Sequence, residues 1–389
     1  MKENNGNKEL RTIVSPSYYG EFSCIADQCS FTCCKEWNIA VDSQTYHDWK
    51  GTCHEGMDLT SYTVPKEGTH AMKLNSEKRC PFLADNELCR LVMQHGEDVL
   101  SDTCATFPRQ IHEYDDRIEA SLVSCCPEVI DIMSRQDRID IDAQDKAGVI
   151  KLEEWQQSPL ARLRGTIMNI IQNPVLDMNM ELMIIFEVML GILDNKGATD
   201  QELRQCESDD YLKRMAADIS TMDFDEVETF LEGNELYLDL VDNYKKEGFY
   251  KEQLKDVVGL AEKIEQGYME EQLPEILKEF KEHFQKYDKL FRNYIAAEFF
   301  TNAIVPDCSL ESMVVMVQWI SLQYVAMRQD IFLNWMLNKS DIEYEDVRTS
   351  IVLISRITGY DQKDIFEYLD SSFQSRIWEW GYEALIVGK

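Results

Sequence analysis

Ten of the twelve cysteines lie between Cys24 and Cys126, and their type and spacing favour a specific chemistry. Thiolate sulfur is the ligand that zinc and iron–sulfur clusters prefer. Ligands close in sequence can form half of a metal site on one turn of backbone, and distant ligands complete it. The sequence therefore predicts a thiolate-bound metal centre. Its candidate ligands are Cys24, Cys29, Cys33, Cys34, Cys80, Cys89 and Cys104, with Cys125 and Cys126 as secondary candidates.

A disulfide framework and simple core burial account for the cysteines less well. Disulfide frameworks are typical of short secreted chains, whereas this chain has 389 residues, and its polar start, Met1 to Arg11, lacks the apolar segment of a secretory signal. We therefore expect a cytoplasmic chain with reduced thiols. Cysteine also packs as a small buried hydrophobe, which suffices for Cys206 and Cys308 but not for so dense a group.

Some cysteines in the group are expected to be structural. Adjacent residues such as Cys33 and Cys34 rarely both reach one ion. One member of each pair is therefore expected to have a structural role instead of binding the metal directly. The six histidines are scattered singly. His54 follows Cys53 directly, and this pair is the best candidate for a mixed site.

Composition limits the classes of function. A formal charge of −32 repels phosphate backbones, so we expect no nucleic-acid binding. The acidic surface either serves solubility or attracts a cationic partner, such as a lysine-bearing protein. With 44% hydrophobic and 10% aromatic residues the chain is globular, and no apolar run approaches the roughly 18 residues of a membrane span.

The common nucleotide-binding and hydrolase motifs are absent from the sequence. There is no Gly-x-Gly-x-x-Gly after a strand, no Walker loop, no His-Glu-x-x-His and no Gly-x-Ser-x-Gly. The doubly wound sheet of many methyltransferases and dehydrogenases is therefore not expected.

Short elements are expected to position the thiols. Residues 38–41 favour a strand, and Asp42 can cap a following helix. A turn at Asp85-Asn86 would bring Cys80 close to Cys89 across a hairpin. We further expect an irregular loop or hairpin at 51–77, a helix at 90–95, a turn capped by Ser101 that presents Cys104, a strand at 117–124 and a helix from Pro127.

Beyond residue 145 the cysteines almost vanish and helical periodicity dominates. Apolar stripes such as those starting at Leu182, Phe284 and Met313 are typical of core-facing helices. We therefore predict a mainly α fold. It would comprise a cysteine-rich metal-binding region with short strands at 1–145 and a helical domain at 146–389.

The ordered cysteine motifs resemble one known family. They are Cys24-x4-Cys29-x3-Cys33-Cys34-x2-Trp37, Cys80-Pro81-Phe82-Leu83 with Cys89, Leu100-Ser101-Asp102-Thr103-Cys104-x3-Pro108-Arg109, and Cys126-Pro127-Glu128. This set resembles the bacterial flagellin lysine-N-methylase family, which shares its cysteine region with a wider group of zinc- or iron-chelating cysteine-cluster proteins. The helical part is also similar to that family, notably Arg292-Asn293-Tyr294-Ile295.

The resemblance implies a protein-lysine N-methyltransferase that methylates surface lysines of flagellin. It also implies S-adenosylmethionine as the methyl donor and a cysteine-bound iron–sulfur cluster, taken here as 4Fe–4S. Zinc is the alternative, because the spacing after Cys24 is four and then three residues rather than Cys-x3-Cys-x2-Cys.

Two routes of methyl transfer follow from this resemblance. A polar route requires a neutral lysine amine near the methyl sulfonium and leaves the cysteines a structural role. A cluster-dependent route would take ligands from Cys29, Cys33 or Cys34, Cys80, Cys89 and Cys104. Arg109 and Trp37 are candidates for cofactor binding, through a carboxylate and the adenine respectively, although a salt bridge and core packing explain them equally well.

A different class of function is also open from the sequence. The chain could be a non-catalytic zinc- or iron-binding protein whose helical part docks a partner.

Overall fold

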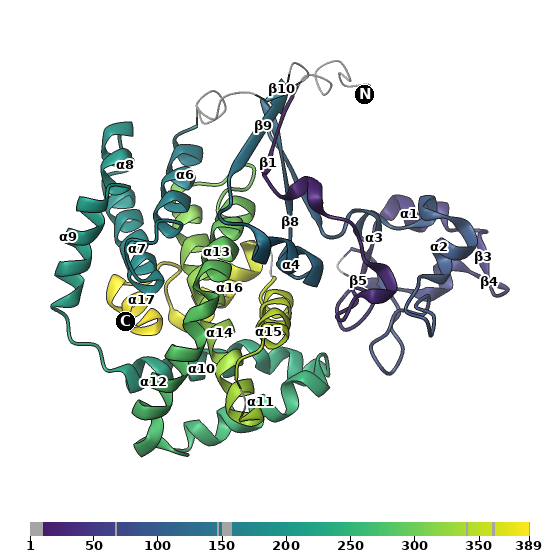
Figure 1. The fold of residues 1–389 in the computed structure, drawn as a ribbon. Coiled ribbons are helices and arrows are strands. Elements are labelled where there is room, and N and C mark those ends of the chain that lie inside the picture. The colour runs from purple at the N-terminus through teal and green to yellow at the C-terminus, as the bar shows by residue number, and fades with distance from the viewer. Residues whose placement is uncertain are drawn as a thin grey trace.

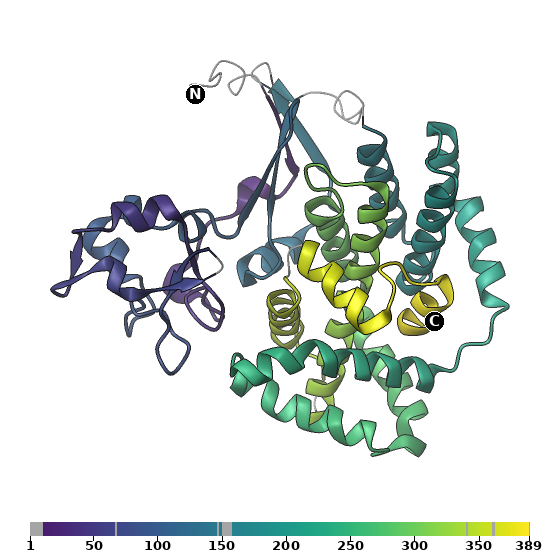
Figure 2. The ribbon, with the colours of Figure 1, turned by 180° about the vertical axis from the view of Figure 1, so that it is seen from behind.

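The computed structural model describes residues 11–66, 68–145, 148–149, 158–339, 341–359 and 362–388. Most of the polar start, residues 1–10, lies outside the described residues. Figures 1 and 2 show three parts: a cysteine-rich module, a narrow twisted sheet and a helical body. The module stands beside the helices, and the sheet rises along the edge of the helical body.

The cysteine module, residues 22–106, is built from short elements. The predicted strand and the helix capped by Asp42 are confirmed, because the Asp42 side chain accepts a hydrogen bond from the Thr45 amide. The helix at 90–95 and the turn capped by Ser101 are also confirmed. The elements are β2 Ala40–Val41, α1 Ser43–Asp48, β3 Cys53–His54, β4 Met57–Asp58, β5 Thr63–Lys66, β6 Thr69–Met72, α2 Arg90–His95 and α3 Asp102–Thr106, with 3-10 turns η3 Ala26–Gln28, η4 Leu59–Tyr62 and η5 Glu97–Val99.

Residues 51–77, expected to be a loop or hairpin, contain two hairpins. β3 pairs antiparallel with β4, and β5 pairs antiparallel with β6, which also pairs with β2. The core of the module is small: only nine buried hydrophobic residues, among them Trp49, Leu59 and Phe82, form its cluster. So small a core contributes little stability by itself.

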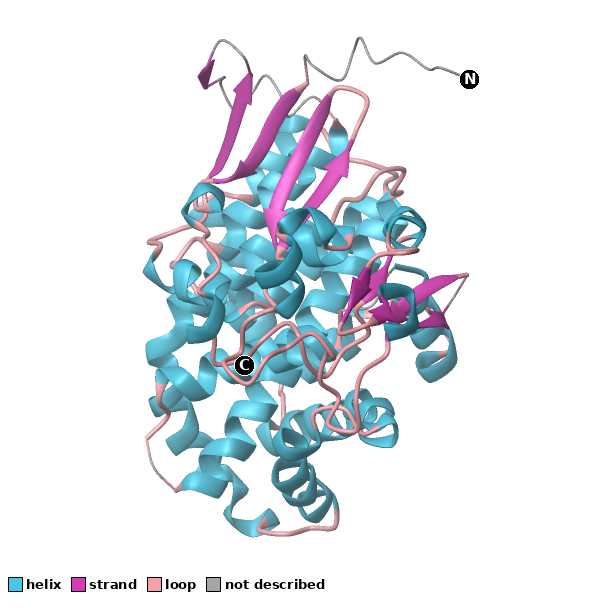
Figure 3. Ribbon diagram, turned by 90° about the vertical axis from the view of Figure 1, so that its right-hand side faces the viewer, coloured by secondary structure: helices cyan, strands magenta, loops and turns pink. Residues whose placement is uncertain are grey.

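A five-stranded sheet links the module to the helices (Figure 3). Its strand order is β10-β9-β1-β8-β7, and β1 runs parallel to β8 whereas the remaining pairs are antiparallel. The strand expected at 117–124 is confirmed as β8. The strands are β1 Thr12–Pro16, β7 Arg109–Glu113, β8 Arg117–Leu122, β9 Ile141–Asp145 and β10 Gly148–Val149, and the turn η2 Tyr19–Glu21 follows β1.

The segment that follows the polar start forms a strand that the sequence did not predict. Thr12–Pro16 forms β1, in which Ile13 pairs with Ile118 of β8 and Val14 is fully buried. The reason is long-range, because β1 gains its burial from strands more than a hundred residues away. β10 continues the same sheet beyond residue 145, and the division at that residue stays a prediction.

The helical body contains the predicted core stripes. Leu182, Phe186 and Met189 are buried, as are Phe284, Phe291 and Met313. The mainly α fold with short strands in its N-terminal part is thus confirmed. The helices are α4 Pro127–Arg135, α6 Pro159–Ile171, α7 Met178–Asp194, α8 Asp200–Cys206, α9 Asp209–Ser220, α10 Glu226–Glu247, α11 Lys251–Glu265, α12 Leu273–Phe284, α13 Asp288–Asn302, α14 Leu310–Asn338, α15 Tyr344–Ile357, α16 Gln362–Phe373 and α17 Trp380–Val387, with turns η6 Glu270–Gln272 and η7 Gln285–Tyr287.

Helix α14 is the central helix of the body. Among the described residues it is the one helix long and apolar enough, by length and composition, to cross a membrane. However, 83% of its most apolar window is buried inside the protein. An apolar surface on all sides is what a helix at the centre of a core requires.

A buried ionic network fastens the sheet to the helices. Glu119 of β8 accepts hydrogen bonds from Arg117 at 2.7 Å and from Arg164 of α6 at 2.7 and 2.9 Å. Arg164 also donates to the Phe300 carbonyl of α13 at 3.0 Å. Glu119 and Arg164 are each 1% exposed. The guanidinium groups of Arg117 and Arg164 must therefore compensate the charge of the buried Glu119 carboxylate.

Glu383 of α17 is a second buried carboxyl. It is fully buried, and burial raises its pKa to about 8, with the Ser321 hydroxyl opposing the shift. An unfolded glutamate titrates near ~4.3. Between these pH values the folded chain binds one more proton at this position than the unfolded chain, so this carboxyl lowers stability as the pH rises towards 8.

We expect Glu383→Gln to be more stable than the wild type by a margin that grows from pH 5 to pH 8. The margin should widen by about 1.4 kcal/mol for each pH unit over most of this range, because the glutamine carries no ionisable group. Urea unfolding at pH 5, 6.5 and 8 measures it, with Glu379→Gln at the exposed start of α17 as the control. Parallel stability curves for Glu383→Gln and wild type would contradict the prediction.

Candidate functional site

Five of the predicted ligands come together in the cysteine module, and we call them the thiol cluster: Cys33, Cys34, Cys80, Cys89 and Cys104. Backbone pairing brings the first three together. The Cys80 amide donates to the Cys34 carbonyl at 2.8 Å, Lys35 and Arg79 form an antiparallel bridge, and the Glu36 amide donates to the Lys78 carbonyl at 2.8 Å. The two segments therefore run side by side at the point where the cysteines occur.

The predicted hairpin positions Cys89. Leu83 and Cys89 form an antiparallel bridge, and the Arg90 amide donates to the Phe82 carbonyl at 2.7 Å. The Glu87 carboxylate in the turn contacts Lys35 and Arg79, each at 3.2 Å. These ion pairs tie the hairpin to the segment that carries Cys33 and Cys34.

Helix α3 supplies Cys104. The Ser101 hydroxyl accepts a hydrogen bond from the Cys104 amide at 3.3 Å, and the Asp102 amide donates to the Asp42 carboxylate at 3.1 Å. The cap of α1 thus also anchors α3. The sequence predicted the caps at Asp42 and Ser101, and Cys104 lies on the turn that Ser101 caps, as expected.

The thiols of the cluster are close enough to perturb one another. The pKa of Cys33 is lowered because it accepts a hydrogen bond from the Cys34 thiol, whose own pKa is raised by the same bond. Burial raises the pKa of Cys80 to about 12, and repulsion from Cys104, Cys89 and Cys33 adds to the shift.

Cys104 belongs to the same group. The residue is exposed, yet its sulfur is enclosed enough that burial raises the pKa to about 11, with further repulsion from Cys33 and Cys89. The electrostatic contacts among these thiols place the five side chains in one region of space.

A second set of cysteines adjoins the cluster around Cys29. Burial raises the pKa of Cys29, and both Cys33 and Cys24 repel its thiolate. Burial also raises the pKa of Cys126 to about 12, with repulsion from Cys29 and Cys125. The predicted ligands and the two secondary candidates therefore lie in one continuous region.

The fit of a metal to this region follows from the chemistry of the side chains. No group of three or more His, Cys, Asp or Glu side chains is arranged as a formed metal site in the part of the chain described here. All twelve cysteines are free thiols. Five thiols gathered in one region are nevertheless the donor set that iron–sulfur clusters and structural zinc require. The residues present fit such a centre.

Arg356 of α15 joins the thiol region to the helical body. Its guanidinium donates to the Phe31 carbonyl at 2.9 Å, to the Thr32 carbonyl at 3.2 Å and to the Cys125 carbonyl at 3.1 Å. It also lies over the Phe31 ring, 4.4 Å from the centroid. One side chain therefore fixes the backbone just before Cys33 and the backbone at Cys125.

Aromatic contacts extend this junction. The Phe31 ring stacks on Tyr250 with centroids 6.2 Å apart, and Lys78 lies 4.3 Å from the centroid of Phe249. The Tyr250 amide also donates to the Glu36 carboxylate, although burial raises the pKa of that carboxyl. No local sequence signal marks Arg356 or Tyr250, because their partners are about 100 to 300 residues away.

The remaining candidates lie as follows. The Trp37 indole donates to the Cys33 carbonyl at 2.6 Å and packs near Phe107, with centroids 5.7 Å apart. Arg109 lies over the Phe22 ring at 5.0 Å and forms no ion pair among the described residues. Cofactor binding by Trp37 and Arg109 stays a prediction.

The proposed Cys53–His54 pair does not join the thiol cluster. Cys53 is exposed, whereas His54 is 5% exposed and packs against Phe82 with centroids 5.4 Å apart. His54 is therefore part of the small core of the module.

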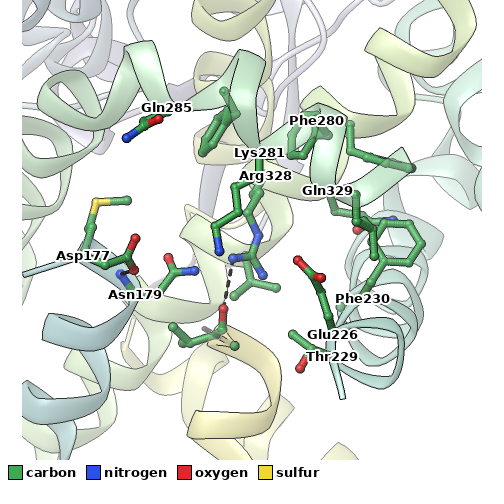
Figure 4. A pocket seen from close by; sticks show the side chains of 18 of the residues that line it. Asp177, Asn179, Glu226, Thr229, Phe230, Phe280, Lys281, Gln285, Arg328 and Gln329 are labelled. Atoms are coloured by element: carbon green, nitrogen blue, oxygen red, sulfur yellow. Dashed lines mark hydrogen bonds between the residues drawn. The ribbon is translucent and has the colours of Figure 1, made fainter. Parts of the chain in front are cut away.

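The helical body holds a cavity of about 580 Å³ that the sequence did not predict. Its lining comes from the starts of α7 and α10, from α12 and α14, and from the end of α17 (Figure 4). Because these residues are far apart in the chain, no motif marked them.

Arg356→Gln should loosen the segment that carries Cys33 and Cys34, because two or three carbonyl contacts are lost. We expect amide hydrogen exchange in residues 29–36 to accelerate by roughly tenfold or more, and exchange in residues 53–72 to change little. Hydrogen exchange with mass spectrometry measures both. Arg376→Gln, which removes an exposed pair with Asp370, is the control. Unchanged exchange in residues 29–36 would refute the role of Arg356.

Comparison with known proteins agrees with this architecture. Residues 164–386 match the family model of the FliB lysine N-methylase C-terminal domain. The flagellar biosynthetic protein FliU of Salmonella muenchen is 32% identical over 133 residues, which cover 31% of this chain and 76% of FliU. Lysine-N-methylases of Salmonella typhimurium and Salmonella choleraesuis are 32% and 31% identical over 133 residues.

The aligned part covers 31% of this chain and 32% of each of these two lysine-N-methylases. No solved structure matches the chain significantly. The family model nevertheless covers more than half of the sequence, including most of the helical body. The chain therefore belongs to the FliB lysine N-methylase family.

Proposed function

We propose that this chain methylates lysine side chains of flagellin with S-adenosylmethionine as the methyl donor, and that its cysteine module holds an iron–sulfur centre. The match of residues 164–386 to a lysine N-methylase domain carries this proposal. The relative FliU is named a flagellar biosynthetic protein, which supports flagellin as the substrate. The non-catalytic alternative is set aside, because the matched family is one of enzymes.

The transfer itself makes definite demands on the substrate. A lysine amine with a pKa near ~10.4 is protonated at neutral pH and must first lose a proton. In the polar route, its nitrogen lone pair then forms a bond to the methyl carbon while the bond from that carbon to the sulfonium sulfur breaks. The products are S-adenosylhomocysteine and N-methyl-lysine, and the released proton passes to solvent or to a nearby base.

The charge of the chain suits a lysine-bearing substrate. The net charge is −32, and a cleft beside α10 is lined by Glu232, Glu235 and Asp239 among other residues. An acidic surface attracts cationic segments and speeds their association. This electrostatic attraction acts on any exposed lysine, so it supports the substrate class rather than one target residue.

The thiol cluster is the proposed site of the inorganic centre. Cys33 or Cys34, Cys80, Cys89 and Cys104 would hold it, with Cys29 as a further ligand. An iron–sulfur cluster there would supply one-electron chemistry and would cross-link the segments that carry the thiols. Zinc, the alternative, would supply only the cross-link. Reduced thiols are consistent with the expected cytoplasmic location.

The proposal predicts methyl transfer in a purified system. Protein prepared without oxygen, incubated with flagellin and methyl-labelled S-adenosylmethionine under reducing conditions, should place label on flagellin lysines. Peptide mass spectrometry would locate each added methyl group as a gain of about 14 Da on a lysine. Flagellin whose lysines have been acetylated is the matched control and should stay unlabelled. Absence of label on unmodified flagellin would contradict the proposed function.

A further inference from the structure

Strand β7 forms one edge of the five-stranded sheet, with β8 on one side and no described strand on the other. Its side chains alternate between two faces. His112 contacts the Thr301 carbonyl of α13 at 3.2 Å, so one face lies towards the helices. Arg109, Ile111 and Glu113 are exposed on the opposite face. An edge strand can pair with a strand of another chain.

The register of β7 with β8 identifies the backbone groups that face the open edge. Tyr114 and Arg117 form a hydrogen-bonded pair beside the turn, with the Tyr114 amide donating at 2.9 Å. Hydrogen-bonded and non-hydrogen-bonded pairs alternate along an antiparallel ladder. Arg109, Ile111 and Glu113 therefore take the non-hydrogen-bonded positions, and their N–H and C=O groups point away from β8. The backbone groups of Arg109 and Ile111 form no hydrogen bond outside the sheet in the part of the chain that the structure describes.

The residues along this edge are complementary to a second copy of themselves. Two β7 strands can lie antiparallel with Ile111 opposite the partner subunit's Ile111. Arg109 then lies opposite the partner subunit's Glu113, and Glu113 lies opposite the partner subunit's Arg109. Each opposed pair can exchange two backbone hydrogen bonds, because the outward groups of both strands meet. Backbone, apolar and ionic contacts thus favour the same register.

The charges at the two ends of the strand can serve a partner. Arg109 lies over the Phe22 ring at 5.0 Å and forms no ion pair among the described residues. Glu113 contacts Arg11 at 3.3 Å, but its side chain stays 50% exposed, and one carboxylate can accept hydrogen bonds from two guanidinium groups. Opposite charges across two strands stabilise their pairing. A parallel pair in register would instead place like charges opposite each other, so the charges specify the antiparallel arrangement.

Apolar surface next to the edge also favours association. Ile111 is 47% exposed, and Ile13 of β1 is 50% exposed. Ile13 pairs with Ile118 and Ile111 pairs with Ala120, so these residues lie on one face of the sheet. Natural edge strands often avoid pairing through a lysine or a proline, and β7 contains neither.

We propose that two copies of this chain associate through antiparallel pairing of their β7 strands, so that their five-stranded sheets become continuous. The two-fold axis passes beside Ile111. Such an interface is closed, because each copy presents the same patch to the other. This proposal concerns the assembly of the chain and does not depend on the reaction that it catalyses.

The expected dimer is weak. A pair of five-residue strands buries less than the roughly 1,200–2,000 Å² of a standard interface. The net charge of −32 on each copy also opposes association at long range, although Arg109 and Glu113 balance each other at the edge. Salt at about 0.15 M screens charges that are more than about 8 Å apart. We therefore expect a micromolar dissociation constant that falls several-fold between ~0.01 M and ~0.15 M salt.

Sedimentation velocity of the full chain over ~1–100 µM tests the proposal. A reducing buffer keeps the free cysteines from forming intermolecular disulfides. The wild type should change from a monomer of 45.3 kDa to a dimer as its concentration rises. Ile111→Lys places two like charges opposite each other at the axis and should weaken association at least about tenfold. Ile13→Lys is the matched control, because it alters a similarly exposed isoleucine on the same face but away from the edge. It should dimerise as the wild type does.

An exchange of charge tests the register. Arg109→Glu alone would place glutamates opposite each other, and Glu113→Arg alone would place arginines opposite each other. Each variant should therefore stay monomeric at ~100 µM. An equimolar mixture of the two variants should form a heterodimer, because every opposed ionic pair then joins a glutamate to an arginine.

Three results would overturn the proposal. A wild type that is monomeric at ~100 µM would leave the edge to a strand of a different protein. A dimer that Ile111→Lys leaves unchanged would use another surface. A mixture of Arg109→Glu and Glu113→Arg that stays monomeric would contradict the register. Thermal unfolding shows whether each variant is folded, and the mixture decides the matter if Ile111→Lys melts below the wild type.

Discussion

The closeness of five thiols in a module with almost no core is the constraint on which this structure depends. Nine buried hydrophobic residues form the core of the cysteine module, and two-residue strands and single turns make up much of the rest. Burial raises the pKa of Cys80 and Cys104, so these groups favour the neutral thiol until a cation compensates their charge. A bound metal would supply that charge and would contribute free energy of folding.

The helical body holds this module through few but specific contacts. Arg356 reaches the carbonyls of Phe31, Thr32 and Cys125, and Tyr250 packs on Phe31. The same body encloses the aromatic and charged cavity near the start of α10. The cysteine module and this cavity are thus two chemically distinct regions, and α10 runs from the cavity towards the junction with the module.

Local signals in the sequence predicted local structure well. The caps at Asp42 and Ser101 and the hairpin that brings Cys80 near Cys89 depend on residues a few positions apart, and all three were predicted. The pairing of β1 with β8, the contacts of Arg356 and the cavity between α7, α10, α12 and α14 were not. Each joins segments between about fifty and three hundred residues apart, and no pattern within a single element encodes such a contact.

The central claim is that the thiol cluster holds an inorganic centre, and elemental analysis tests it most directly. Wild-type protein purified without oxygen should contain bound iron with acid-labile sulfide, or zinc, and Cys206→Ala outside the cluster should contain the same amount. Replacing Cys33, Cys80, Cys89 and Cys104 with alanine should remove that metal. Wild-type protein without metal, or a fourfold variant with unchanged metal content, would contradict the account.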